Sequence, residues 1–209
     1  MSQLLLKRGG AFLSPAFFRE IQTLKDIYLD KKQRFDPSII ISGKLCEYGH
    51  IQVITCRPLS EKLRPFPTTF WLTCPHLIKR AGTVESCGGV HELEEYIQSH
   101  ALHNEWQKYN FLHQILKLKL LNLNGNENIC LFMRKYHNKI FKSLIRSGIG
   151  GIKLTGEKDN INIKCLHLQT ASYLGLGFHP ACEWLDSKGL CGENCGKNSC
   201  SEKFKKLNI

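Results

Sequence analysis

The segment Thr68-Thr69-Phe70-Trp71-Leu72-Thr73-Cys74-Pro75 decides the fold class. Its first part is rich in β-branched and aromatic residues, which predicts a buried strand over Thr68–Thr73. The proline predicts the first turn of a helix, because that turn does not use the backbone N–H that proline lacks. We therefore expect the chain to pass from a strand into a helix at Cys74, and the helix to run to about Ser86.

The pattern on both sides of this segment adds further strands and helices. Upstream, Ile39–Ile41 and His50–Thr55 read as short strands. Downstream we expect the following elements: a long helical region over Val90–Leu123, a helix over Ile129–Arg146, a hairpin of Ile152–Leu154 with Ile161–Ile163, and a helix over Lys164–Leu174. The fold class is therefore α+β: a small mixed or antiparallel sheet packed with several helices, followed by an irregular Cys-rich C-terminal tail.

Three regions are expected along the chain. Residues 1–37 form an N-terminal helical extension, because Ser14-Pro15 is a helix start and Asp36-Pro37 a helix end. Residues 38–182 form the α+β domain. Residues 183–209 form a tail rich in Cys and Lys.

The charge of the chain is strongly positive. Lys and Arg number 29 and Asp and Glu 18, for a formal charge of +11, and the stretch from Ala101 to Arg146 holds eight basic residues and two acidic ones. A surplus of this size favours phosphate-rich partners such as RNA or another polyanion. No apolar run approaches the roughly 18 residues that cross a bilayer, and the N-terminus lacks the order of a secretory signal. We expect a cytoplasmic protein with no membrane partner.

Two of the ten cysteines are expected at helix starts. Cys74 and Cys165 each follow a predicted strand and precede a helix, where backbone N–H groups and the helix dipole favour the thiolate. A histidine follows each by two residues, and either one, His167 in particular, could be a ligand or a proton shuttle. Cys74 and His167 are thus the candidates for a catalytic role. The alternative is that both thiols are small buried residues that pack under the helices.

The tail holds a second group of thiols. They are Cys182, Cys191, Cys195 and Cys200, with glycines between them that let a backbone wrap closely around an ion. Four thiolates complete the coordination of Zn or of an iron–sulfur cluster. The spacing is looser than the usual paired C-x2-C, so a tail without metal is the alternative.

A basic stripe is expected on the helix over Ile129–Arg146. Lys135, Lys139, Lys142 and Arg146 recur at intervals of four, three and four, beside an apolar stripe of Phe132, Tyr136, Ile140 and Leu144. This pattern predicts a helix that docks its apolar stripe on the core and points its cations outward, toward phosphates. A merely solvated charged face is the alternative.

The run Leu63–Pro75, with Cys46-Glu47-Tyr48-Gly49 upstream, resembles the bacterial family called domain of unknown function 501. Its Gly-Ile-Gly-Gly turn and its Val-Lys-Cys-Leu-His motif have counterparts at Gly148–Gly151 and Ile163–His167. The likeness covers roughly residues 44 to 182. A second histidine, frequent in the family, is Gln169 here, and the family's Asn-Pro is His179-Pro180.

The resemblance implies that Cys46, Cys74 and Cys165 are the family's signature thiols, but it supplies no reaction. Our leading hypothesis is a metal or iron–sulfur site built from these three, with His167 or a tail cysteine as the fourth ligand, acting on an RNA-like or phosphorylated substrate. The second hypothesis is a non-catalytic module that binds RNA or another polyanion. The third is a structural or interaction protein whose cysteines are core packing.

Overall fold

The computed structural model describes residues 39–60, 64–66, 68–122, 128–146, 148–150 and 161–192. The expected N-terminal extension, the first strand of the expected hairpin at 152–154, and the tail beyond residue 192 lie outside the described residues. Within the described ranges, no helix has the length and apolar character that crossing a membrane requires.

The sheet has three strands in the order β1-β2-β3, and both pairings are antiparallel. The strands are β1 (Ile40–Leu45), β2 (Ile51–Cys56) and β3 (Phe70–Leu72). The central strand β2 is almost fully buried, as its composition of β-branched residues favours. These are the three strands that the sequence predicted before the helix that Pro75 begins.

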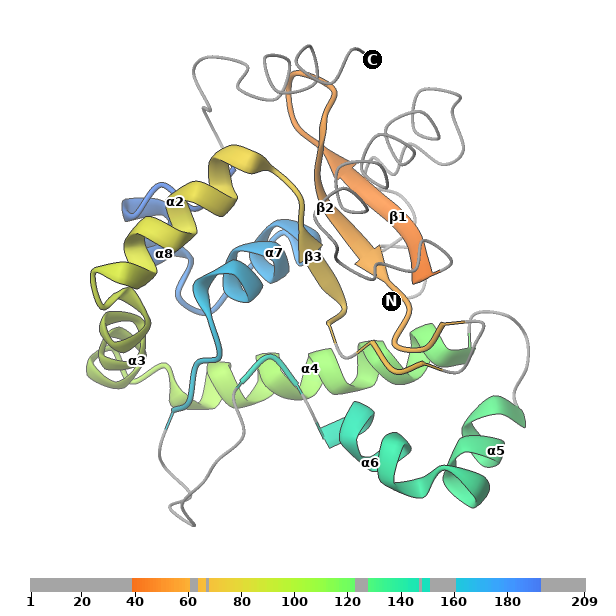
Figure 1. The fold of residues 1–209 in the computed structure, drawn as a ribbon. Coiled ribbons are helices and arrows are strands. Elements are labelled where there is room, and N and C mark those ends of the chain that lie inside the picture. The colour runs from red at the N-terminus through yellow and green to blue at the C-terminus, as the bar shows by residue number, and fades with distance from the viewer. Residues whose placement is uncertain are drawn as a thin grey trace.

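Seven helices follow in the described part of the chain (Figure 1). They are α2 (Pro75–Ser86), α3 (Gly89–Ser99), α4 (His103–Asn122), α5 (Asn128–Tyr136), α6 (Asn138–Arg146), α7 (Leu166–Leu176) and α8 (Cys182–Ser187). Together with the antiparallel sheet they form an α+β fold, as predicted. Helix α2 has the predicted bounds, because Pro75 starts it and Gly88, with a left-handed φ of 86°, follows its end.

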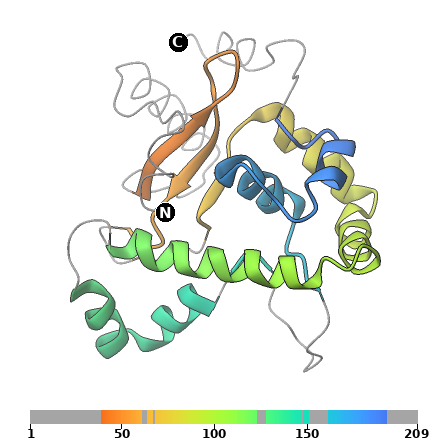
Figure 2. The same ribbon diagram turned by 180° about the vertical axis from the view of Figure 1, so that it is seen from behind.

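The core lies where α7 crosses the sheet. Helix α7 packs on β3 and β2, α2 lies beside it, and the long helix α4 passes beneath both, as the two opposite views show (Figures 1 and 2). The approach of α7 to the sheet requires a glycine, since a Cβ at Gly175 would lie 2.3 Å from the Phe70 ring.

The expected helical region over Val90–Leu123 is confirmed, and it consists of two helices, α3 and α4. The chain breaks after α3 at Ala101, which has a left-handed φ of 55°. The N–H of Leu102 donates to the carbonyl of Ile97 and the N–H of Ala101 to that of Gln98, which is a Schellman helix end. The break lets α4 turn away from α3 and run under the sheet.

The expected helix over Ile129–Arg146 is also two helices. Helix α5 ends at Tyr136, α6 begins at Asn138, and Figure 1 shows the change of direction between them. The expected docking of one continuous apolar stripe was therefore wrong. Leu144 on α6 is buried, whereas Phe132 and Tyr136 on α5 are exposed, and Met133 anchors α5 instead.

The compact body continues past residue 182, where the sequence suggested that a tail begins. Helix α8 was not expected from the irregular composition after His179. Its Trp184 and Leu185, with Leu190 beyond it, join the core cluster that α3, α4 and α7 also line.

Candidate functional site

Cys74 and Cys165 both occupy the helix starts that the sequence predicted. Cys74 precedes Pro75 at the start of α2 and is buried, and Cys165 precedes α7 and is half-buried. Neither side chain caps its helix by a hydrogen bond. Both positions are confirmed by the structure, although Ile163, just before Cys165, makes only an isolated bridge to Gly150 rather than a full strand.

The two thiols nevertheless lie at opposite ends of α7. The N–H of Cys74 donates to the carbonyl of Gln52 (3.2 Å), and the Gln52 side chain donates to the carbonyl of Gly192 (3.0 Å). Gly192 in turn lies against Leu174, near the last turn of α7. Cys165 precedes Leu174 by nine residues, or about 13 Å along a helix axis.

The proposed centre of Cys46, Cys74 and Cys165, with His167, is therefore not assembled. Cys46 is half-buried at the turn between β1 and β2, where its N–H donates to the carbonyl of His50. In the ranges that the structure describes, no three side chains of His, Cys, Asp or Glu lie together in a way that could hold a metal ion. Neither the family resemblance nor the spacing of the cysteines along the sequence predicts the path of the chain in space. That path separates these thiols.

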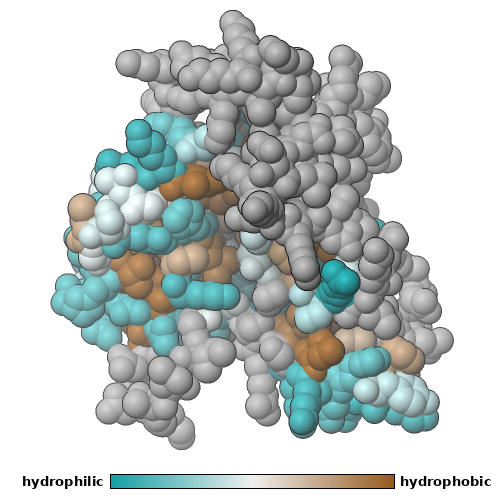
Figure 3. All heavy atoms as spheres, viewed as in Figure 1, coloured by the Kyte–Doolittle hydropathy of each residue, from teal (hydrophilic) through white to brown (hydrophobic). Residues whose placement is uncertain are grey.

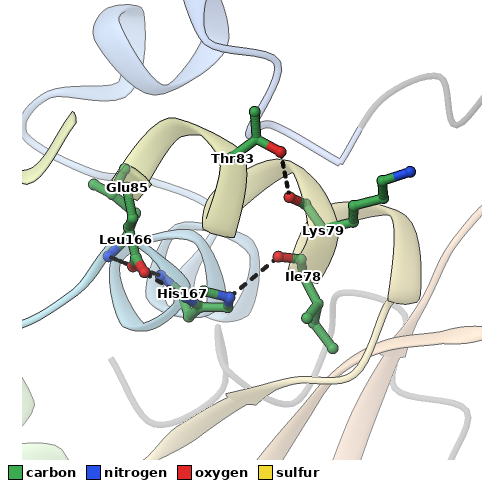
Figure 4. A network of polar contacts seen from close by, with 6 residues as sticks. All are labelled: Ile78, Lys79, Thr83, Glu85, Leu166 and His167. Carbon is green, nitrogen blue, oxygen red and sulfur yellow. Dashed lines mark hydrogen bonds and ion pairs between the residues drawn. The ribbon is translucent and has the colours of Figure 1, made fainter. Parts of the chain in front are cut away.

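His167, the candidate ligand or proton shuttle, joins α7 to α2 (Figure 4). Its Nδ1 is 3.0 Å from Oε1 of Glu85, and its Nε2 is 3.1 Å from the carbonyl oxygen of Ile78. The same Glu85 oxygen accepts the backbone N–H groups of Leu166 and His167, so it caps α7 from a neighbouring helix. Both ring nitrogens of His167 already have oxygen partners, and binding a metal would break one of these contacts.

The environment of Cys165 opposes the thiolate. Burial raises the pKa of the Cys165 thiol, and the Glu85 carboxylate raises it further, while backbone N–H groups and Lys164 oppose the rise. Burial thus outweighs the N–H groups at this helix start, and one of them, the N–H of His167, also donates to the Glu85 carboxylate.

The tail thiols are described only in part. Cys182 is the first residue of α8 and Cys191 follows it, and both are half-buried. Cys195 and Cys200 lie outside the described residues, so the four-cysteine site stays a prediction. The assignment of Zn or an iron–sulfur cluster stays a prediction with it.

A cluster of buried polar side chains between α4 and α7 was missed in the sequence. Nε2 of His179 is 3.0 Å from Oε1 of Gln169, and Nδ1 of His179 accepts the N–H of Ala181, which leaves Nε2 as the donor. Burial lowers the pKa of His179 to about 3, with a smaller effect from His113. Gln169 and His179 each stand where the resemblance leads one to expect another residue, and they contact each other.

Helix α4 adds two buried titratable groups to this cluster. His113 and Lys117 are each 2% exposed. Burial lowers the pKa of His113 to about 3, with help from Lys117, and burial, then Lys164, lowers the pKa of Lys117 to about 8. The sequence held a signal for this burial. His113 and Lys117 are four residues apart and adjoin Leu116 and Leu120, which places them on the buried face of a helix.

The cations of α5 and α6, in contrast, lie on the surface as predicted. Lys135, Lys139 and Lys142 are exposed, as is Arg134, whereas the side chain of Arg146 lies outside the description. Helix α5 also exposes three apolar residues: Leu131 is 64% exposed, Phe132 41% and Tyr136 61%. We call these residues the aromatic–basic surface: Leu131, Phe132, Arg134, Lys135, Tyr136, Lys139 and Lys142. Hydrophobic and hydrophilic side chains alternate over this part of the molecule (Figure 3).

The rings of this surface lie close to one another and to a cation. The centroids of Phe132 and Tyr136 are 5.1 Å apart, and those of Phe132 and His137 are 5.5 Å apart. Nζ of Lys135 lies 5.0 Å from the centroid of the Tyr136 ring, within the range of a cation–π contact. The surface thus offers π faces and positive charge side by side.

Comparisons with known proteins give a family but no activity. The family described as protein of unknown function DUF501 matches residues 42–187, which is 146 of the 209 residues of the chain. No curated protein and no solved structure matches the chain. The matched range starts within β1 and ends with α8, so both α5 and α6 lie inside it.

Proposed function

This chain belongs to the DUF501 family, whose function is unknown, and we propose from the geometry of α5 and α6 that it is a binding module for RNA. The observation that carries the proposal is the exposure of Lys135, Lys139 and Lys142 on two consecutive helices, the first of which also exposes aromatic rings. Phosphate contacts from lysine and arginine supply most of the affinity of non-specific nucleic-acid binding.

The charge distribution supports this choice of partner. The chain has a formal charge of +11, and α5 and α6 contain no Asp or Glu. Lys117 is one of the eight basic residues between Ala101 and Arg146, but it is buried and unavailable to a ligand. The exposed cations of the aromatic–basic surface are therefore the ones that would meet phosphates, and each phosphate contact should add about −0.7 to the slope of log affinity against log salt on a single strand.

The first test compares two double charge reversals. Lys139→Glu with Lys142→Glu changes the proposed surface, and Lys79→Glu with Lys108→Glu makes the same change in net charge at exposed positions of α2 and α4. Fluorescence anisotropy with a labelled 12-nucleotide RNA, from 50 to 200 mM KCl, measures affinity and salt slope. We expect the first variant to lose about tenfold or more in affinity and to flatten the slope, as fewer phosphates are contacted.

The control variant should lose much less, because its lysines lie elsewhere on the molecule. Equal losses of RNA affinity in both variants would show that only the net charge of the protein matters. That result would contradict the assignment of RNA binding to the aromatic–basic surface. Absence of RNA binding by the unaltered protein at 50 mM KCl would refute the proposed function as a whole.

A further inference from the structure

We infer that the aromatic–basic surface binds single-stranded RNA and that unpaired bases stack on Phe132 and Tyr136. The inference rests on the proposed function and narrows its ligand class. Lysines alone would suit any polyanion, whether duplex RNA, single-stranded RNA or a polymer without bases. The exposed aromatic rings of α5 distinguish these ligands, because only a ligand with unpaired bases can stack on them.

The exposure of the rings is the first observation. Phe132 and Tyr136 are 41% and 61% exposed, and Leu131, which directly precedes Phe132, is 64% exposed. Helix α5 is held to the body by Met133, which is 1% exposed. Exposed apolar side chains gathered on one short helix mark an interaction site, because a folded chain gains by burying such groups.

The arrangement of ring and cation matches the two parts of a nucleotide. Nζ of Lys135 lies 5.0 Å from the centre of the Tyr136 ring. A base that stacks on an aromatic face is joined through its sugar to a phosphate a few ångströms away, and a cation at the edge of the stacking site can meet that phosphate. Phe132, 5.1 Å from Tyr136 and tilted by 43°, offers a second face to a neighbouring base.

The form of the surface favours a flexible strand over a duplex. In duplex RNA the faces of the bases are stacked on one another, and the deep, narrow major groove does not admit side chains. The change of direction at His137 also places Lys139 and Lys142 on a different helix from Lys135. A flexible single strand can follow such a bend.

An anionic membrane surface fits the side chains less well. An interfacial helix separates a broad apolar face from its cations so that one face can enter the bilayer. On α5, Nζ of Lys135 lies 5.0 Å from the centroid of the exposed Tyr136 ring, so a cation lies within the apolar group and not on a separate face. Vesicle binding is therefore an alternative outcome of the test.

The experiment compares the protein with the double variant Phe132→Ala, Tyr136→Ala. The matched control is Phe111→Ala, because Phe111 is 60% exposed but lies on α4. Four probes are used: a 12-nucleotide oligouridine RNA, a 12-base-pair RNA duplex, inorganic polyphosphate of similar charge, and vesicles of phosphatidylserine and phosphatidylcholine. Circular dichroism verifies that each variant is folded, as expected for changes at exposed positions.

We expect the unaltered protein and the Phe111→Ala variant to bind the single strand about tenfold more tightly than polyphosphate, since each stacked base adds affinity. The double variant should lose this preference and retain its affinity for polyphosphate. Equal affinity of the unaltered protein for the single strand, the duplex and polyphosphate would overturn the inference and leave the proposed function standing. A preference that survives in the double variant, or binding to vesicles alone, would also overturn it. Failure to bind either RNA or polyphosphate would refute the proposed function itself.

Discussion

Replacing Lys117 with methionine should stabilise the protein at neutral pH. Lys117 is 2% exposed on α4, and burial lowers the pKa of its ammonium from 10.5 to about 8. At about 1.4 kcal/mol per pH unit, the buried charge costs about 3 kcal/mol of stability wherever it is protonated in both states. Methionine has a similar unbranched shape and no charge. It gives up the polar interaction that Lys117 makes, worth about 1 kcal/mol, so we expect a net gain of about 2 kcal/mol.

The pH dependence separates this cause from others. Because the folded pKa of Lys117 lies below its unfolded value, the unfolded chain binds more protons between pH 8 and 10.5. The stability of the unaltered protein therefore rises across this window relative to that of the Lys117→Met variant. The advantage of the variant should be complete below pH 8 and should shrink as the pH approaches 10.5.

Urea unfolding followed by tryptophan fluorescence at pH 7, 8, 9 and 10 measures this difference. The matched control is Lys119→Met, because Lys119 lies on the same helix but is exposed. It should change the free energy of unfolding by less than about 0.5 kcal/mol at every pH. The reasoning is refuted if Lys117→Met is less stable than the unaltered protein at pH 7, or if its advantage is the same at pH 7 and pH 10.

Three further perturbations follow from the described contacts. Because burial lowers the pKa of His113 from 6.5 to about 3, the protein should lose stability as the pH falls from 6.5 toward 3. In acid unfolding curves the His113→Leu variant should lose less stability per pH unit, and an unchanged slope would contradict the burial of a neutral ring. Glu85→Ala should lower the free energy of unfolding in urea by about 1 to 2 kcal/mol, since the first-turn N–H groups of α7 lose their acceptor. The control Glu95→Ala, at an exposed site, should change it very little, and equal effects of the two variants would argue against the helix cap. Gly175→Ala should destabilise the protein by about 1 to 3 kcal/mol in urea unfolding, because its Cβ would lie 2.3 Å from the Phe70 ring. The control Gly82→Ala, whose Cβ would have its nearest neighbour at 3.9 Å, should be neutral or stabilising by up to about 1 kcal/mol. A tolerated change at Gly175 would show that α7 can shift away from the sheet.

Several elements could be predicted because their causes are local. The bounds of α2 follow from Pro75 at its start and Gly88 beyond its end, and both act within a few residues. The strands follow from runs of β-branched and aromatic residues. The breaks at Ala101 and His137 carry no glycine or proline, and they arise where the chain must redirect its apolar face toward a core assembled from distant elements.

The functional residues divide in the same way. The exposure of Lys135, Lys139 and Lys142 was predictable, because a charged side chain is rarely buried without a partner. Lys117, on the neighbouring helix, is buried and makes a polar interaction, and its burial was not predictable from its charge. The positions of Cys74 and Cys165 at helix starts were also predictable, whereas their separation was not.

The sequence by itself determined the composition of each strand and helix, the positive charge of the chain and the junctions at which strands give way to helices. These properties depend on interactions between residues a few positions apart. Only the tertiary structure decided that the thiols stay apart, that His113 and Lys117 are buried, and that Phe132 and Tyr136 face outward. Those outcomes depend on which distant surfaces meet, and that is settled by the packing of the whole core around α7.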